Sequence, residues 1–365
     1  VINDFYAELH NYFAYKSVSL MGDTGQLIII GGKETDGEYF CNRLTYCFIK
    51  AIKQSKLPDP KLLLRVSSNM PEDLLSLALD CNMTGIGSPL LSNDERVIPA
   101  LEAFGYTHED ACNYVTSACW EPFSYGNALG RNNLNTVNYA KVLEDVYKAK
   151  DFSEIRDYTS LTNMYCKKLK ANVENILADI DKIRWERNPL MSLFISDCTK
   201  FGKDVSEGGA VHNDYGILAV GLANAVDSLL NIKHLVFENA SLSLQELKNA
   251  AIGDFSANEN LRKMLSDNAY FAHEDTEVHE LITKITSVVE NCCKDYTNYL
   301  GGKVKFGLSS PSYMEEGEKI GATFDGRRGC KPLAVPISAE LGEPSPELIN
   351  LAGTLDYNGM RRNGN

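Results

Sequence analysis

Positive charge is scarce in this sequence and is not clustered. The 365 residues include 36 lysines and arginines against 49 aspartates and glutamates, which gives a formal net charge of −13. Basic pairs occur at residues 167–168, 327–328 and 361–362, too scattered along the chain to indicate one basic patch. Because proteins that bind nucleic acids carry a concentrated basic surface, we expect no nucleic-acid partner.

Long apolar stretches and export signals are also missing. No segment approaches the roughly 20 apolar residues that span a bilayer. The first residues, Val1-Ile2-Asn3-Asp4, show no basic region followed by an apolar run. The ten cysteines form no Cys-x-x-Cys pair. Irregular cysteine spacing without an export signal is typical of free thiols in a reducing compartment, so we expect a cytoplasmic protein with no membrane contact.

Two further patterns lack the residues that a ligand site needs. His273 and His279 lie six positions apart, which is poor spacing for two ligands on one helix, and a metal ion needs more partners. Gly301-Gly302 is not followed by the Lys-Ser/Thr of a phosphate-binding loop. We therefore expect no bound metal, and we interpret the glycine pair as a helix cap.

The composition is that of an ordinary globular protein of one or two domains, with 44% hydrophobic and 23% charged residues. Short apolar runs alternate with stretches of helical spacing, which predicts an α/β fold. The runs lack a clean polar alternation, as expected for parallel strands covered on both sides. We predict strands at residues 25–32, 61–66, 114–116 and 193–196. We predict helices at residues 1–20, 42–54, 93–104, 135–150, 158–184, 218–237 and 276–300, and helix starts at Pro71, Thr107 and Ser243.

A strand-like segment is followed by a stretch that holds both a cysteine and a carboxylate. Pro122, Gly126 and Gly130 do not extend a strand, so we predict a loop after residue 116. Cys119 and Glu121 are two positions apart, and alternate side chains of an extended chain share a face. Both side chains can therefore point into one pocket. Considered alone, Cys119 has the alternative interpretation of a small buried hydrophobic residue, and Glu121 that of a surface acid.

Several segments, spread along nearly the whole chain, form a further pattern. They are Gly31-Gly32, Leu44-Thr45-Tyr46, Gly85-Ile86-Gly87-Ser88-Pro89, Asn93-Asp94-Glu95, Ile98-Pro99-Ala100-Leu101, Cys119-Trp120-Glu121-Pro122, Ala140-Lys141-Val142-Leu143-Glu144, Asn188-Pro189-Leu190, Gly208-Gly209-Ala210, Gly221-Leu222-Ala223-Asn224-Ala225-Val226-Asp227-Ser228-Leu229 and Gly321-Ala322-Thr323-Phe324-Asp325-Gly326-Arg327-Arg328. In their order and spacing, these segments together resemble the glycyl radical enzymes, which include the pyruvate formate-lyase-like and the glycerol- or choline-lyase-like proteins.

The resemblance implies an α/β fold that forms part of a ten-stranded barrel, wrapped by helices, with the cysteine on a loop inside. It implies that a radical stored on a backbone glycine passes to the Cys119 sulfur, and that this thiyl removes a hydrogen atom from a small organic substrate. Glu121 would act as base or acid beside it, a role that burial favours because burial raises the pKa of a carboxyl group. A separate activating enzyme of the radical S-adenosylmethionine (SAM) type would install the radical. No metal or organic cofactor would be bound, and a homodimer is usual.

The residues around the motif narrow the reaction that the resemblance implies. Ala118 stands where the formate acetyltransferases proper have a second cysteine, which argues against acetyl transfer. Cys-x-Glu-Pro resembles the branch that eliminates water or an amine or decarboxylates arylacetates, so we expect elimination or decarboxylation. Asn133 stands where the diol and choline lyases have an acidic residue, which leaves the substrate open. By the same resemblance, Asn133, Val335 and Ile337 would contact the substrate.

The resemblance covers only part of the family's length. We interpret residues 1–365 as the central to late part of one pyruvate formate-lyase-like domain. The family's N-terminal part and its C-terminal glycine radical loop, of the form Arg-Val-x-Gly-Tyr, have no match. We expect either a fragment of a longer protein or a radical glycine on a separate chain. Two alternatives stay open: a catalytically inert or split subunit that needs a glycine-radical partner chain, and an ordinary nucleophilic cysteine that needs a base such as His212.

Overall fold

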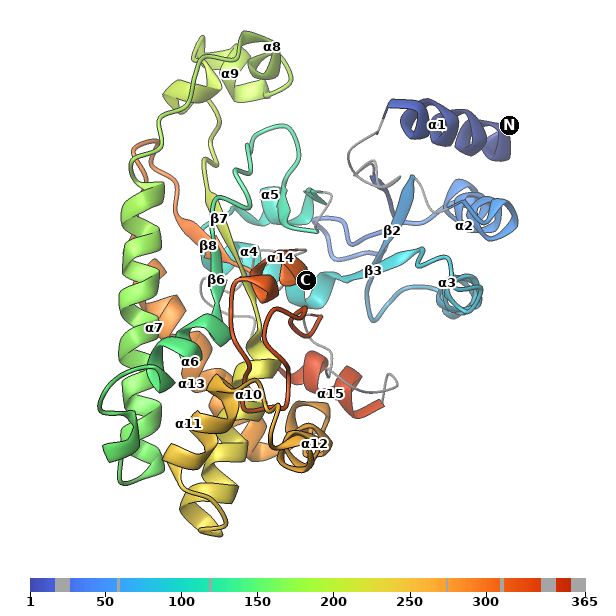
Figure 1. Ribbon diagram of the computed structural model, residues 1–365. Coiled ribbons are helices and arrows are strands. Elements are labelled where there is room, and N and C mark those ends of the chain that lie inside the picture. Colours follow the sequence, from blue (N-terminus) through green and yellow to red (C-terminus); the bar gives the residue numbers. More distant parts are fainter. Residues whose placement is uncertain are drawn as a thin grey trace. The chain divides into compact units, whose positions relative to one another are not determined.

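The structure, a computed structural model, describes residues 1–16, 27–57, 60–117, 120–273, 275–308, 312–335 and 346–355. The chain forms two compact units (Figure 1). The first comprises Val1–Gly130 and Asn188–His212, and the second comprises Arg131–Arg187 and Asn213–Gly364. Each unit contains a three-stranded parallel sheet with helices packed against it. The predicted α/β fold is therefore confirmed.

The first unit is built on a parallel sheet in the order β1-β2-β3. Its strands are β1 (Leu27–Ile30), β2 (Lys61–Val66) and β3 (Leu90–Asn93). The apolar run of β2 is covered on both sides, since Leu62, Leu63 and Leu64 are all buried. Helices α2 and α3 contact each other and form the two crossovers of the sheet (Figure 1). The helices of this unit are α1 (Ile2–Lys16), α2 (Arg43–Ser55), α3 (Glu72–Asn82), α4 (Asp94–Phe104), α5 (His108–Cys112), α8 (Pro189–Ser192), α9 (Ser196–Phe201) and the 3₁₀ turn η2 (Val205–Glu207).

Side-chain caps start two helices of this unit at the positions that the sequence predicted. Asn93 caps α4 by accepting a hydrogen bond from the Glu95 backbone N–H at 3.0 Å. Thr107 caps α5 in the same way through the Asp110 N–H. Gly105 ends α4 with a φ of 117°, a conformation that glycine adopts without a Cβ clash. These caps fix the path of the chain from β3 through α4 and α5 toward the strand that carries the site.

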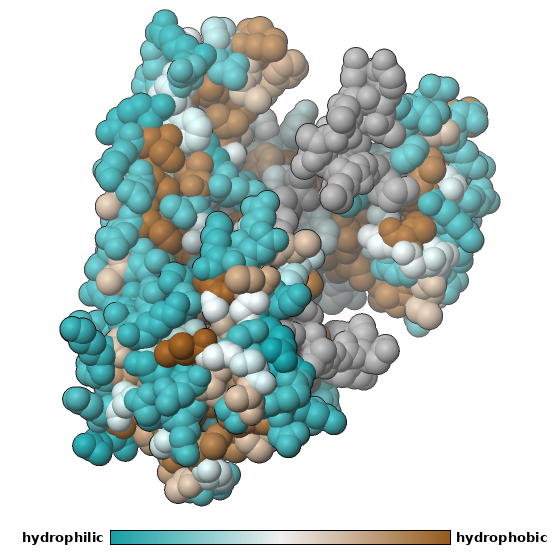
Figure 2. Space-filling view, in the orientation of Figure 1, coloured by the Kyte–Doolittle hydropathy of each residue, from teal (hydrophilic) through white to brown (hydrophobic). Residues whose placement is uncertain are grey.

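The predicted strand at residues 193–196 is wrong. This apolar stretch lies where α8 gives way to α9, and Pro189 begins α8 because proline is pre-organised for a first helical turn. Leu193 and Phe194 are 69% and 73% exposed. Figure 2 shows hydrophobic residues gathered over this segment, where Leu190 is also exposed. Exposed apolar patches of this kind are typical of contact surfaces.

The second unit contains a parallel sheet in the order β6-β7-β8. Its strands are β6 (Thr136–Asn138), β7 (Tyr215–Val220) and β8 (Val304–Phe306). All six residues of β7 are buried, as expected for a central parallel strand. Helices α6, α7, α10 and α13 pack against one another around this sheet (Figure 1). The helices are α6 (Tyr139–Tyr147), η1 (Phe152–Glu154), α7 (Tyr158–Ile180), α10 (Leu222–Ile232), the π-helix η3 (Lys233–Glu238), α11 (Leu244–Ile252), α12 (Glu259–Asp267), η4 (Tyr270–Ala272), α13 (Thr276–Cys293), α14 (Tyr313–Glu318) and α15 (Pro346–Thr354).

Two predicted helices of this unit begin with a strand instead. Residues 136–138 form β6 before α6, and residues 218–220 end β7 before α10. A short continuous apolar run fits both a buried strand and a buried helix, so periodicity does not separate the two. Gly221 makes the break after β7, because its φ is 73° and a Cβ there would lie 3.0 Å from the Cβ of Ala140. Helix α10 itself is buried along its whole length.

Asp227 lies in the buried helix α10, and burial raises the pKa of its carboxyl group to about 8. The Phe271 backbone N–H donates to its Oδ1 at 2.7 Å and lowers the pKa, whereas nearby Asp325 raises it. Between about pH 4 and pH 8 the folded protein therefore holds a proton that the unfolded chain releases. The free energy of unfolding should fall as the pH rises through this range, by at most about 1.4 kcal/mol per pH unit from this group. Asp227→Asn is expected to remove this slope, because an amide does not titrate and its oxygen still accepts the Phe271 bond.

Urea unfolding at several pH values between about 5 and 8 measures this effect. Asp151→Asn is the matched control, because it replaces the same ionisable group at an exposed position. The control should keep the slope of the natural protein. Equal pH slopes in the natural protein and in Asp227→Asn would contradict the prediction.

Candidate active site

A β-hairpin in the first unit carries the predicted cysteine and carboxylate. Its strands β4 (Tyr114–Thr116) and β5 (Pro122–Ser124) pair antiparallel. The prediction that Pro122 continues a loop is wrong, because Pro122 begins β5. A proline is tolerated at the first residue of a strand, where its missing N–H leaves little of the ladder unpaired. Glu121 therefore lies directly before a strand of a hairpin rather than in a long loop.

Two backbone hydrogen bonds close the turn of this hairpin. The Ser117 N–H donates to the Glu121 carbonyl at 3.0 Å, and the Trp120 N–H donates to the Ser117 carbonyl at 2.9 Å. Trp120 has a φ of 66°, a left-handed conformation that bulky residues rarely adopt and that clusters at functional sites. Ala118 and Cys119 lie outside the described residues. The position of the Cys119 sulfur therefore stays a prediction.

The Glu121 residue is buried, with only 1% of its surface exposed. Glutamate is one of the residues least often buried to this degree, because a carboxylate loses its hydration there. A buried carboxyl group in a turn that also contains a cysteine is a candidate for proton transfer. The burial on which the predicted acid–base role of Glu121 depends is therefore present, whereas the role itself stays a prediction.

His212, the candidate base for a nucleophilic cysteine, has partners of its own in the first unit. Its Nε2 lies 2.9 Å from Oδ2 of Asp110, and its ring stacks on Tyr106 with centroids 3.7 Å apart. Asn127 donates to the other Asp110 oxygen at 2.6 Å. Burial alone would raise the pKa of Asp110, but its hydrogen bonds, first that with His212, lower it. This arrangement gives His212 a structural role and weakens the nucleophilic-cysteine alternative.

Two of the three predicted substrate contacts, Asn133 and Val335, belong to the second unit. Asn133 is exposed and has a φ of 58°. Asparagine is enriched in this left-handed conformation, so the backbone geometry alone explains the residue type. Val335 is 51% exposed, and Ile337 lies outside the described residues. Contacts between these three side chains and a substrate stay predictions.

Sequence reasoning missed Asn224, which holds the beginning of the segment that contains Val335. The Asn224 Nδ2 donates to Oδ2 of Asp325 at 2.6 Å, and its Oδ1 accepts a hydrogen bond from the Ala334 N–H at 2.9 Å. Asn224 and Asp325 are both buried. A signal was present, because an asparagine inside the apolar stretch of α10 needs a hydrogen-bonding partner when it is buried.

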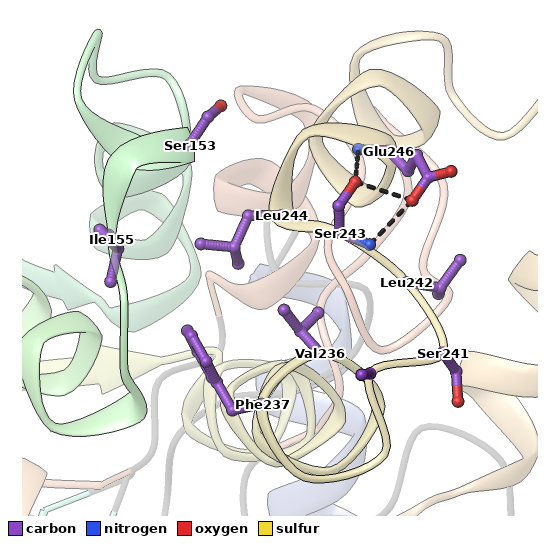
Figure 3. Close-up of a pocket in the computed structure, with 10 residues that line it drawn as sticks. Ser153, Ile155, Val236, Phe237, Ser241, Leu242, Ser243, Leu244 and Glu246 are labelled. Carbon is purple, nitrogen blue, oxygen red and sulfur yellow. Dashed lines mark hydrogen bonds between the residues drawn. The ribbon is translucent and has the colours of Figure 1, made fainter.

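A pocket in the second unit is formed mainly by residues 236–246, which run from the end of η3 to the beginning of α11. Figure 3 shows the side chains of Ile155, Phe237 and Leu244 around it. Its acid, Glu246, belongs to the capping box of α11, in which Glu246 accepts from the Ser243 N–H and the Ser243 Oγ accepts from the Glu246 N–H. Because these polar groups satisfy the helix start, we assign no reaction to this pocket.

Neither a metal-binding cluster nor a membrane-spanning helix occurs in the described ranges of the chain. No group of three or more His, Cys, Asp or Glu side chains there could hold a metal ion. No helix there combines the length and the apolar character that a bilayer crossing requires.

Comparisons with known proteins show which proteins this chain resembles. The pyruvate formate lyase-like family matches residues 12–314. Trans-4-hydroxy-L-proline dehydratase of Clostridioides difficile is 27% identical over 338 residues, which cover 86% of this chain and 42% of that protein. The glycerol-bound B12-independent glycerol dehydratase of Clostridium butyricum matches with a TM-score of 0.84 and 29% identity, over 92% of this chain and 45% of that one. A glycyl radical enzyme of Archaeoglobus fulgidus matches with a TM-score of 0.82 and 26% identity, over 94% and 47%.

The chain spans less than half the length of these relatives. Within that span, the match runs through both units and includes the hairpin with its cysteine and glutamate positions. The resemblance that the sequence segments indicated is confirmed, as is the α/β barrel type of fold that it implied.

Proposed function

Because this chain belongs to the pyruvate formate lyase-like family, we propose that it supplies the reactive cysteine and the proton-transfer carboxylate of a glycyl radical lyase. Cys119 is the thiyl residue and Glu121 is its acid–base partner. The observation that carries the proposal is the burial of Glu121 on the β4–β5 hairpin, two positions after Cys119. Two of the relatives named above are dehydratases, which supports lyase chemistry.

The proposed reaction begins at the Cys119 sulfur. A glycyl radical, installed by an activating enzyme of the radical SAM type, supplies the unpaired electron. Cys119 in its thiyl form takes a hydrogen atom from a substrate carbon, so that an S–H bond forms, a C–H bond breaks and the unpaired electron moves to carbon. After the substrate has reacted, the thiol returns the hydrogen atom to the product radical. Such chemistry needs a site closed to water and oxygen, and the burial of Glu121 is consistent with one.

Glu121 moves the proton that the elimination requires. Once the unpaired electron is on carbon, loss of a neighbouring hydroxyl group as water needs a proton, and a carboxyl group can donate it. The substrate radical then loses a proton of its own to the carboxylate, which restores the carboxyl group and leaves a neutral product radical. The names of two relatives point to hydroxylated compounds, trans-4-hydroxy-L-proline and glycerol. This supports dehydration of a small hydroxylated substrate over decarboxylation. Ala118, in place of a second cysteine, argues against acetyl transfer.

Exposure to air separates this proposal from that of a nucleophilic cysteine. We expect product to form from a small hydroxylated substrate only under anoxia, in an assembly that includes the radical glycine and the activating enzyme. Brief exposure to air should remove the activity together with the electron paramagnetic resonance (EPR) signal of the radical, because oxygen reacts with carbon-centred radicals. A sample kept anoxic for the same time is the control. Full activity after exposure to air would contradict the radical mechanism.

A further inference from the structure

We infer that a buried network of Arg65, Asp94 and Tyr114 positions the β4–β5 hairpin, and with it Glu121, for the reaction. This inference rests on the proposed function and adds three positioning residues to it. The three side chains come from β2, from the first turn of α4 and from β4, all within the first unit. None of them belongs to the hairpin turn itself.

The centre of the network is a two-point ion pair between Arg65 and Asp94. The Arg65 Nε donates to Asp94 Oδ1 at 2.9 Å, and its Nη2 donates to Asp94 Oδ2, also at 2.9 Å. The side chains are 9% and 0% exposed. A planar guanidinium matches a carboxylate in this geometry, which fixes the orientation of both groups. Because burying two charges costs much of what their attraction returns, such a pair suits a positioning role better than a purely stabilising one.

Tyr114 connects this ion pair to the hairpin. Its hydroxyl group donates to Asp94 Oδ1 at 2.7 Å and lies 2.8 Å from the Ser92 Oγ. The guanidinium carbon of Arg65 lies 4.1 Å from the centre of the Tyr114 ring, within the range of a cation–π contact. The Arg65 Nη1 also donates to the Cys112 carbonyl at 2.9 Å, two residues before Tyr114. The chain is thus held both at the beginning of β4 and just before it.

The backbone around the ion pair is shaped to accept it. The Lys33 N–H donates to Asp94 Oδ2 at 2.6 Å. Gly32 has a φ of 129°, and a Cβ there would lie 2.7 Å from the Arg65 Cζ, so a side chain at this position would collide with the guanidinium. Arg65 lies near the carboxyl end of β2 and Ser92 near that of β3. The carboxyl ends of parallel strands are where α/β sheets place their binding sites.

The pairing of the strands carries this constraint to Glu121. Tyr114 lies opposite Ser124, and the Tyr125 N–H donates to the Asn113 carbonyl at 3.1 Å, so the anchored residue is at the base of the hairpin. The strands between this base and the Ser117–Glu121 hydrogen bond are only three residues long. If the base of the hairpin becomes mobile, the turn that carries Glu121 therefore becomes mobile as well.

The variant Tyr114→Phe tests the network, because it keeps the ring over Arg65 and removes the hydroxyl group that reaches Asp94. Hydrogen exchange of residues 113–125, followed by mass spectrometry, should become at least about 10-fold faster as the hairpin opens more often. Tyr165→Phe is the matched control. It removes another buried hydroxyl group, one that donates to the Tyr139 carbonyl at 3.0 Å in the second unit. It should leave exchange in residues 113–125 unchanged.

In an active assembly, Tyr114→Phe should also lower kcat per radical at least about 10-fold, with KM and the EPR-measured radical content unchanged. Ser92→Ala, which removes a single partner of the hydroxyl group, should fall between the natural protein and Tyr114→Phe, and it provides the test if Tyr114→Phe does not fold. Natural rates of exchange in residues 113–125 would overturn the inference, as would faster exchange with an unchanged kcat. An inactive natural protein would contradict the proposed function. Hydrogen exchange does not depend on turnover, so it would still test whether the network anchors the hairpin.

Discussion

Replacing Cys119 with serine is expected to abolish product formation in an assembly whose radical glycine is fully loaded. Serine has nearly the same shape, but its O–H bond is much stronger than the S–H bond of cysteine, so the radical cannot pass to the side chain. The radical is stored elsewhere, and its EPR signal should therefore persist while turnover stops. This combination separates loss of the thiyl residue from failed activation.

Cys81→Ser is the matched control for this variant. Cys81 is a fully buried thiol of the first unit, and its Sγ lies 3.9 Å from the Ile49 carbonyl. It belongs to a hydrophobic cluster that includes no described residue of the hairpin. The control should keep its activity, at most with a lower melting temperature. If Cys119→Ser kept full activity in a competent assembly, the assignment of the thiyl residue would be wrong.

The second large effect is expected for Glu121→Gln. Glutamine keeps the size of the side chain and removes the proton that the carboxyl group donates. We expect kcat to fall by about 10²–10⁴-fold, the usual contribution of a positioned acid or base. KM and the radical signal should change little, because substrate binding and activation do not need the proton. A substrate analogue with a better leaving group should recover much of the lost rate, because such a group departs without a proton.

Glu109→Gln controls for the change in net charge, because Glu109 is exposed on α5, in the same unit. Its kinetic constants should equal those of the natural protein. A fall in kcat of less than about 10-fold for Glu121→Gln, or an equal fall for every leaving group, would show that Glu121 does not donate the proton of this step.

Elements with strong local signals could be predicted from the sequence. Strand β2 has the predicted bounds, because a compact apolar run lies between a proline-containing segment and the helix start at Pro71. Strand β7 was placed partly in a predicted helix, and strands β3, β5, β6 and β8 were not predicted. Each of these last four has only three or four residues, too few for a periodic pattern, and each is defined by the strand beside it. The same reason explains the wrong strand prediction at Leu193 and Phe194. These residues are apolar, but no strand in the described part of the chain lies beside them to pair with.

The candidate site likewise contains residues that nearby sequence identifies and residues that only the fold brings together. Cys119 and Glu121 could be selected because their spacing is local and their segment resembles a known family. The network that anchors their hairpin could not, because Arg65 is 29 positions from Asp94, and Asp94 is 20 positions from Tyr114. Only the folded chain brings these three residues together. A charged residue in the apolar run of β2 was the single hint in the sequence that Arg65 needs a buried partner.

The discontinuity of the first unit affects the order in which the chain acquires its structure during synthesis. Residues 188–212 belong to this unit, yet they leave the ribosome after residues 131–187 of the second. Ser196 N–H donates to the Gly126 carbonyl at 2.8 Å, and Val211 N–H donates to the Asn127 carbonyl at 3.1 Å, so the segment directly after the hairpin is completed by chain made later. At roughly 5–20 residues per second, the wait is on the order of several seconds. During this interval Gly126 and Asn127, just after the hairpin of residues 114–124, lack their final hydrogen-bonding partners, and chaperones or proteases can reach this part of the chain.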